Sequence, residues 1–133
     1  MRYNVYHIMK TFGQKYKELR LKRGFSLREF CRINGLDPSN LSKMERDVLP
    51  PPPIVLLHNY LEYINVEQGT DLWFEMIDLA AISCGRIPHY ILSDKKLAEK
   101  MPIFFKVVRN SEKLNGKDVV DTLKGIIKDA WTA

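Results

Sequence analysis

The first third of the chain carries successive pairs of helix-start and helix-stop signals, and these constrain the fold more than any other feature. Thr11 stands three residues before Gln14, the spacing of a capping box in which each side chain accepts a hydrogen bond from the other residue's backbone N–H. Ser26 and Glu29 repeat that spacing. Each of the two segments ends in a glycine, and the second, Gly35, can adopt the left-handed conformation that closes a helix. The pattern predicts two helices, the second shorter than the first.

A third helix is expected to begin at Pro38. Asp37 occupies the N-cap position, where its carboxylate can accept hydrogen bonds from unpaired backbone N–H groups, and the proline already has the φ of a first helical residue. Leu41 and Met44 have the spacing of a buried stripe. The exposed side then carries small polar and cationic side chains instead of the usual mixture of Glu and Lys: Ser39, Asn40, Ser42, Lys43 and Arg46.

The middle of the chain continues with helical spacing after a proline spacer. Four prolines at 50–53 cannot lie inside a helix and form a stiff extended segment. Apolar periodicity then predicts helices over 54–66 and 71–86, the second with Thr70 or Asp71 as its cap. Because the second of these is apolar nearly all round, we expect it to be buried.

The last part of the chain is also expected to be helical. One helix should start at a Ser93 cap and break or restart at Pro102, and another should follow over 116–133. Alternation typical of a strand is weak outside residues 2–8. The sequence therefore predicts an all-α fold.

Charge is distributed unevenly along the chain. Residues 1–48 contain 11 Lys and Arg against 5 Asp and Glu, a balance of +6, whereas residues 49–133 contain 10 against 11, a balance of −1. A basic surface favours nucleic-acid binding, because each phosphate that Lys or Arg neutralises releases condensed counterions. A solvated basic helix would give the same balance, so charge alone does not decide between these interpretations.

Several functional classes lack support in the sequence. No segment approaches the ~18 uninterrupted apolar residues of a membrane span, and no secretory signal is recognisable, so we expect a cytoplasmic protein with no membrane partner. Cys31 and Cys84 are expected to be reduced, buried thiols because both fall in apolar-patterned helices. His7, His58 and His89 have no partners at metal-ligand spacing, and no phosphate-binding loop or nucleophile motif is present. We therefore expect no enzymatic activity and no cofactor.

Residues 19–47, LRLKRGFSLREFCRINGLDPSNLSKMERD, resemble the phage repressor and Cro-type (Xre-like) helix-turn-helix family. They share the family's basic first helix, the small buried residue at Cys31, the turn at Gly35 and the buried apolar pair of the third helix. The resemblance covers residues 11 to about 66. It implies a five-helix DNA-binding domain over 1–66 and an α-helical C-terminal extension over 67–133 for dimerisation or partner binding.

The resemblance also implies roles for individual side chains, since the second helix of a helix-turn-helix enters the DNA major groove. Ser39, Asn40 and Lys43 would face base edges, where an asparagine can bond adenine at two atoms and a lysine can reach guanine. Arg20 and Glu45 would form a partly buried ion pair between the first and third helices. Phosphate contacts, which position the helix without reading sequence, would come from four further residues: Ser42, Arg46, Arg28 and Lys15.

The sequence departs from the family at three places. Leu27 stands where the family usually has a glutamine that contacts a phosphate, and Arg28 is only a weak substitute for it. Asn34 replaces a usual aliphatic core residue, and the four prolines replace a more varied linker. These departures bear on affinity and docking more than on fold.

Two functions remain open. Repressors of this kind act as dimers, because two recognition helices ~34 Å apart fit successive major grooves. The first function is therefore a dimeric transcriptional repressor that binds double-stranded DNA through helix 38–46. The apolar content of residues 67–133 favours self-association, a toxin-binding surface or both, with a plain second core as the alternative. The second function is an antitoxin whose C-terminal helices neutralise a toxin protein and which represses its own operon.

Overall fold

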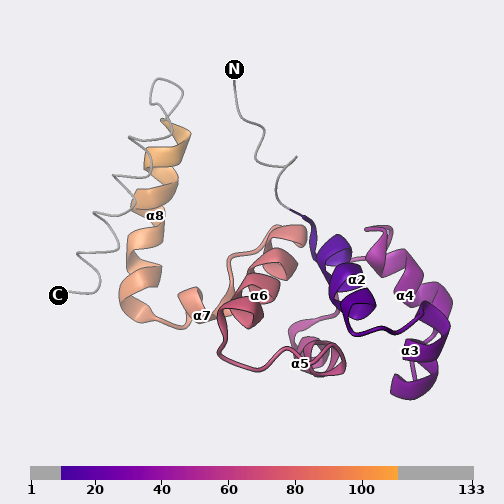
Figure 1. Cartoon of the computed structure of the whole chain (residues 1–133). Helices are drawn as coiled ribbons and strands as arrows, with labels where there is room; N and C mark the ends of the chain where they lie inside the picture. The colour runs from indigo at the N-terminus through magenta and orange to yellow at the C-terminus, as the bar shows by residue number, and fades with distance from the viewer. Residues whose placement is uncertain (1–9, 111–133) are drawn as a thin grey trace. The chain divides into compact units, whose positions relative to one another are not determined.

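The structure is a computed structural model that describes residues 10–110 of the 133-residue chain, and these residues form seven helices and no strand. They belong to two compact units, the first ending at Arg86 and the second beginning at Ile87 (Figure 1). The all-α class is thus confirmed for this part of the chain. The helices are α2 (Phe12–Lys22), α3 (Leu27–Asn34), α4 (Pro38–Glu45), α5 (Ile54–Tyr63), α6 (Asp71–Ser83), α7 (His89–Leu92) and α8 (Lys95–Arg109).

Local capping explains where α2 and α3 begin. The backbone N–H of Gln14 donates to Oγ1 of Thr11 at 3.1 Å, and the N–H of Thr11 donates to Oε1 of Gln14 at 3.1 Å, so the first capping box is complete. The second forms only in part. Oγ of Ser26 accepts from the Glu29 N–H at 3.2 Å, but the Glu29 carboxylate accepts from Arg32 at 2.9 Å instead of reaching back. Arg32 lies one turn along the same helix and offers the opposite charge.

Aromatic side chains form the centre of the first unit. Tyr16 of α2 is fully buried among Phe12 of its own helix, Phe30 of α3 and Tyr60 of α5, with ring centroids 5.8, 6.1 and 6.1 Å away. Its hydroxyl donates to the carbonyl O of Tyr60 at 2.7 Å, so the buried phenol is paired. Burial raises the pKa of Tyr16 above its ordinary value. One side chain thereby joins three helices.

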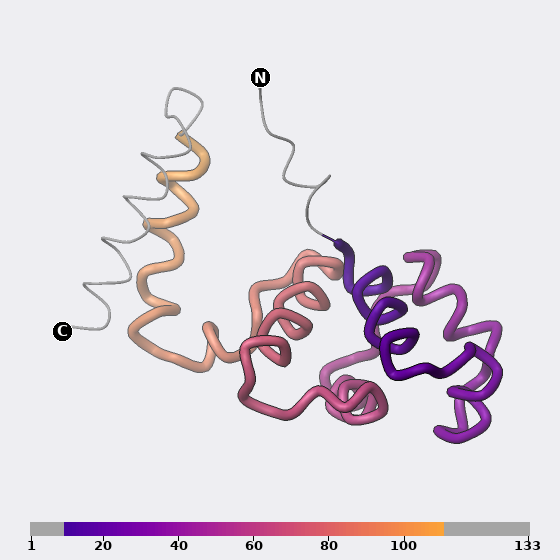
Figure 2. Tube along the Cα trace, in the orientation of Figure 1, coloured from indigo at the N-terminus to yellow at the C-terminus, as the bar shows by residue number. Residues whose placement is uncertain are grey.

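Helix α2 contacts both α4 and α6, and its first turn packs directly on the end of α4 (Figure 2). Gly13 permits this approach. A Cβ at that position would meet the carbonyl oxygens of Met44 and Glu45 and the carboxylate of Asp47, all closer than van der Waals contact. Asp47 also accepts a hydrogen bond from Oγ1 of Thr11 at 2.8 Å. The positive end of the α2 dipole therefore faces backbone carbonyls and a carboxylate, which is a favourable arrangement.

Helix α5 follows the four prolines, as expected, but ends before residue 66. Asn65 takes a left-handed φ of 61°, which interrupts the helix after Tyr63. The N–H of Val66 then donates to the carbonyl of Leu61 at 2.9 Å, a hydrogen bond typical of a closed helix end. Val66 is still buried, so the periodicity of the sequence marks core positions beyond the helix itself.

Helix α6 completes the first unit. It starts after Thr70, whose Oγ1 accepts from the Trp73 N–H at 3.2 Å, and it buries Trp73, Met76 and Ile77. Because α6 contacts α2, the first compact unit reaches Arg86 and extends past the division at residue 66 that the sequence indicated. The helix is not buried all round, since its outer side exposes Ile82.

The two cysteines do not share one environment. Cys31 is buried, as predicted, and desolvation raises the pKa of its thiol. Cys84 occupies the C-cap of α6 and is exposed, so the prediction that both thiols are buried is wrong for Cys84. The helix itself ends at Ser83, one residue before Cys84, so helical periodicity does not apply to this side chain.

The second unit, in its described part, consists of α7 and α8. The cap of α8 is Asp94 rather than the expected Ser93: Oδ1 of Asp94 accepts from two backbone N–H groups at 3.0 and 3.2 Å. The helix is also not broken at Pro102, which lies exposed inside it. The proline removes one hydrogen bond, and the rest of the helix continues on both sides. The expected strand-like 2–8 and helical 116–133 segments lie outside the described residues. None of the helices in 10–110 has the length and apolar content needed to cross a membrane.

Candidate nucleic-acid interface

Helix α4 begins as its sequence indicated. Asp37 has extended backbone angles of φ −80° and ψ 121°, and its carboxylate accepts from the Asn40 N–H at 3.4 Å. The preceding turn is closed by Gly35 in the left-handed region at φ 67°, while the N–H of Leu36 donates to the carbonyl of Cys31 at 2.9 Å. A residue with a Cβ would be strained at that φ. The turn and the cap together fix the direction in which α4 leaves α3.

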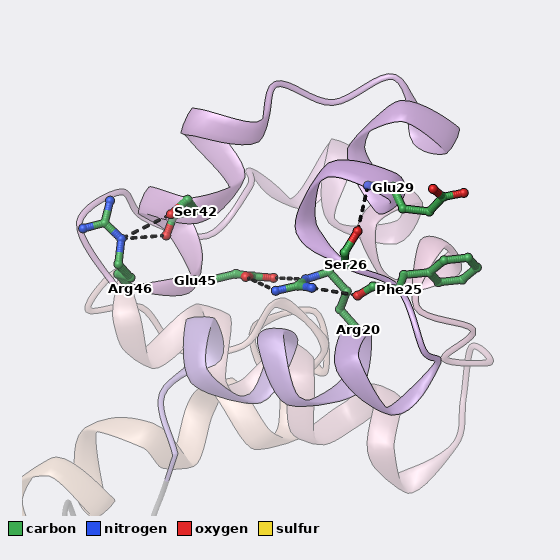
Figure 3. A network of polar contacts seen from close by, with 7 residues as sticks. All are labelled: Arg20, Phe25, Ser26, Glu29, Ser42, Glu45 and Arg46. Atoms are coloured by element: carbon green, nitrogen blue, oxygen red, sulfur yellow. Dashed lines mark hydrogen bonds and ion pairs between the residues drawn. The ribbon is translucent and has the colours of Figure 1, made fainter.

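The inner side of α4 is held by packing and by one ion pair (Figure 3). Leu41 and Met44 are buried. The Glu45 carboxylate accepts from both Nε and Nη2 of Arg20, each at 2.9 Å, and the two residues are only 5% and 3% exposed. Arg20 also donates to the carbonyl of Phe25 at 2.8 Å. The hydrogen bonds to Glu45 raise the pKa of the Arg20 guanidinium. The pair thus lies deeper than the partly buried one that was expected, and it joins the last turn of α4 to α2.

Backbone hydrogen bonds hold the C-terminal end of α4. The carbonyl of Lys43 accepts from the N–H of Val48 at 2.8 Å and from that of Leu49 at 3.2 Å. Asp47 has a left-handed φ of 63°, which is uncommon for a residue other than glycine but is tolerated best by Asn and Asp. The chain leaving α4 is therefore fastened back onto the helix itself.

The outer side of α4 carries the residues that we call the α4 surface: Ser39, Asn40, Ser42, Lys43 and Arg46. The three expected base-contact residues in this set, Ser39, Asn40 and Lys43, are all exposed, and their spacing places them on one side of the helix. Ser42 is half-buried and Arg46 is exposed. Nε of Arg46 donates to both the carbonyl and Oγ of Ser42, each at 3.3 Å, so these two expected phosphate-contact residues lie together (Figure 3).

The remaining two expected phosphate contacts are placed differently from each other. Arg28 is exposed in the first turn of α3, a helix that contacts α4. Lys15 is half-buried on α2 and lines a hollow of about 600 Å³ together with three carboxylates of α6: Asp71, Glu75 and Asp78. Those carboxylates would repel a phosphate. Lys15 is therefore not grouped with the α4 surface.

The two departures from the family pattern in α3 are accommodated locally. Leu27 is half-buried at the start of the helix. Asn34 is also half-buried, and its Nδ2 donates to the carbonyl of Phe30, one turn back, at 2.9 Å. A polar residue in place of an aliphatic one is thus satisfied within its own helix.

Sequence reasoning missed the contact of Gly13 and Thr11 with Asp47, which positions the end of α4. A glycine inside an otherwise periodic helix is a recognised signal of close packing, so Gly13 could have been found. Its partner could not, because Thr11 and Asp47 are 36 residues apart and no local pattern relates them.

The described residues show no arrangement for metal binding, since no group of three or more His, Cys, Asp or Glu side chains in 10–110 could hold an ion. Comparison of the chain with protein-family models, with curated proteins and with solved structures gave no match. The case for function accordingly depends on the α4 surface and on how it is held.

Proposed function

We propose that the protein is a sequence-specific DNA-binding transcriptional regulator in which α3 and α4 form a helix-turn-helix. One observation carries the proposal. The inner side of α4 is fixed by two buried apolar residues and the Arg20–Glu45 pair, while its outer side holds Ser39, Asn40 and Lys43 in solvent. A rigid helix with an exposed side that is polar and cationic suits entry into the major groove.

In this proposal the base contacts come from the outer side of α4. Asn40 bonds adenine through its amide, Lys43 reaches O6 and N7 of guanine, and Ser39 bonds either base. Each well-formed contact of this kind is worth ~1–3 kcal/mol of discrimination against a wrong base. Since Asn40 makes its cap hydrogen bond through the backbone, its side chain is available for DNA.

Phosphate contacts come from Ser42, Arg46 and Arg28, and these fix the register of the helix on the duplex. Arg46 is already held beside Ser42, so the two can grip one phosphate with little loss of side-chain freedom. A single module would bind weakly, and we propose a dimeric repressor whose two α4 helices enter successive major grooves about one helical turn apart.

The test is a set of titrations of the full chain against DNA from its own upstream region, at several salt concentrations. Wild-type binding should weaken steeply with salt. Asn40→Ala and Lys43→Ala should each reduce the preference for the upstream sequence over random DNA by roughly 10- to 100-fold while keeping non-specific affinity. Arg46→Ala should instead weaken binding to both DNAs and lower the salt slope by about 1.

Lys22→Ala serves as the matched control, because Lys22 is an exposed cation on α2, outside the α4 surface. Its sequence preference should equal that of the wild type. If Asn40→Ala and Lys43→Ala also keep the full preference, then the base-reading assignment is wrong.

A second candidate is an antitoxin that binds a toxin protein through its C-terminal helices. One observation favours it: α8 buries no residue fully, and Ile103 and Phe105 are 51% and 43% exposed. Co-expression with the product of the adjacent reading frame would test this. A partner that co-purifies with the wild type and with Ile82→Asp, but not with Phe105→Asp, supports the antitoxin. A partner that is retained by Phe105→Asp argues against α8 as its binding site.

A further inference from the structure

An exposed run of apolar residues follows α4 directly. Residues 48–56, Val-Leu-Pro-Pro-Pro-Pro-Ile-Val-Leu, contain no charged side chain and no side-chain hydrogen-bonding group, and we call them the 48–56 strip. All five of their large aliphatic side chains are exposed, Val55 most of all at 79% and Val48 next at 61%. Soluble proteins rarely leave such a run open to water unless it binds something.

The strip also forms one wall of a hollow of about 330 Å³ beside α4. Leu49, three of the prolines and Leu56 line it on one side, and Leu41 and Met44 of α4 contribute to it on the other. Asn40 lies at the same hollow. The 48–56 strip and the α4 surface are therefore neighbours, and a partner that covers the strip would lie next to the proposed DNA contacts.

We propose that the 48–56 strip is the surface through which two copies of this chain associate. Self-association fits an uncharged surface. In a two-fold symmetric contact each residue near the axis meets its own copy, so charged residues there would repel, whereas apolar residues are self-complementary. The first 48 residues have a balance of +6, so two copies would repel at most other places in this region.

The strip can form the apolar centre of such a contact, because its five aliphatic residues are between 38% and 79% exposed. A standard interface of ~800 Å² per partner likewise has an apolar centre inside a polar rim. The extended prolines are stiff, so little conformational entropy is lost when they are covered. DNA, a polyanion, would gain nothing from a surface without cations.

The inference deepens the proposed function and depends on it for its biological meaning. Because the Lys43 carbonyl accepts from the N–H groups of Val48 and Leu49, the strip is joined to the base-reading turn of α4 by backbone hydrogen bonds. A contact between two strips would therefore fix the separation of two α4 helices with no flexible linker between interface and DNA surface. The contact between the two strips, and not the second unit, would then set the spacing of the two operator half-sites.

Val55→Glu in the full chain tests the location of the interface. Val55 is the most exposed aliphatic residue of the strip and lies in the first turn of α5, where Glu is tolerated and interacts favourably with the helix dipole. A symmetric dimer would bring two such carboxylates together, so the dimer dissociation constant from sedimentation equilibrium should rise about 100-fold or more. Ile82→Glu is the control, since Ile82 is 56% exposed on α6 and should leave dimerisation unchanged.

Cysteine cross-linking supplies a positive test that does not rely on loss of association. In a Cys84→Ser background, Val55→Cys should give a covalent dimer with a short bis-maleimide, and Ile82→Cys should not. The proposal is overturned if the wild type is monomeric at ~100 μM, a concentration far above a typical specific dimer constant. It is also overturned if Val55→Glu dimerises like the wild type, or if Ile82→Glu is equally disruptive.

Sedimentation and cross-linking are both done without DNA, so their results test the interface independently of the proposed DNA binding. Loss of dimerisation in Val55→Glu, together with unaltered sequence preference in Asn40→Ala, would keep the interface and reject base reading by α4. The opposite pair of results would keep base reading and reject the strip as the interface.

Discussion

Replacing Glu45 alone should destabilise the protein more than replacing Glu45 and Arg20 together. In Glu45→Leu, the Arg20 guanidinium loses two hydrogen bonds of 2.9 Å and stays as an unpaired charge in a site where it is only 3% exposed. Breaking one side of a buried pair in this way costs ~3–5 kcal/mol. In the double variant Arg20→Met/Glu45→Leu no charge remains, and the main loss is the hydrogen bond from Arg20 to the Phe25 carbonyl, ~1–3 kcal/mol.

Urea unfolding followed by circular dichroism measures these differences in the free energy of unfolding. The matched control is Glu29→Gln, since Glu29 and Arg32 form an exposed pair with side chains 50% and 69% accessible. That pair should contribute less than ~1 kcal/mol. The reasoning is refuted if Glu45→Leu costs no more than Glu29→Gln, or if the double variant is less stable than Glu45→Leu.

Three further substitutions test other parts of the account. Gly13→Ala should lower the free energy of unfolding by ~1–3 kcal/mol or more, because the added Cβ has no room against the end of α4. Urea unfolding measures this loss, and a stability close to that of the wild type would contradict the close contact. Tyr16→Phe should cost ~1 kcal/mol for the hydrogen bond to Tyr60. Since the pKa of Tyr16 is raised on folding, wild-type stability should be intact below about pH 10, where an unfolded tyrosine titrates, and should fall above it. Thermal melts across that range should show a weaker decline in Tyr16→Phe, and equal declines would contradict the assignment. Asp37→Ala should remove ~1 kcal/mol of capping energy in the same melts, and an unchanged midpoint would argue against the cap.

The features that could be predicted from sequence depend on chemistry within a few residues. The capping box at Thr11, the cap at Asp37 and the left-handed Gly35 each involve a side chain and a backbone group no more than four positions away. Helical periodicity likewise placed Leu41 and Met44 in the core. These local rules were enough to predict the all-α class and the side of α4 that faces solvent.

The wrong predictions lie where two neighbouring side chains compete for one structural role, or where the place of a residue depends on contacts with distant parts of the chain. Asp94 caps α8 in preference to Ser93: Oδ1 of Asp94 accepts from two backbone N–H groups, whereas Oγ of Ser93 donates to the carbonyl of Tyr90. Cys84 follows the apolar residues of α6 yet lies just past the end of that helix. The expected phosphate contact of Lys15 stays a prediction, but the hollow that Lys15 lines together with Lys10 also holds carboxylates of α6, far along the chain. No pattern within α2 could have shown that.

The helical first unit also extends further than local signals indicated. A division after residue 66 was natural because α5 ends near it and a polar loop follows. The apolar side of α6 nevertheless packs on α2, so the compact unit ends at Arg86. Packing between elements decides such boundaries, and it depends on three-dimensional complementarity that a single sequence does not display.

The most direct measurement for the central claim is DNA cleavage from a reagent attached to the outer side of α4. In a Cys84→Ser background, Ser39→Cys would carry an iron chelate at the exposed start of the helix, and Ile82→Cys would carry it on α6. The account predicts that the chelate at position 39 cuts the upstream DNA in two major-groove zones about one helical turn apart, with little cutting from position 82. Cutting that is absent from position 39, or equal from both positions, would contradict the claim that this side of α4 meets the base pairs.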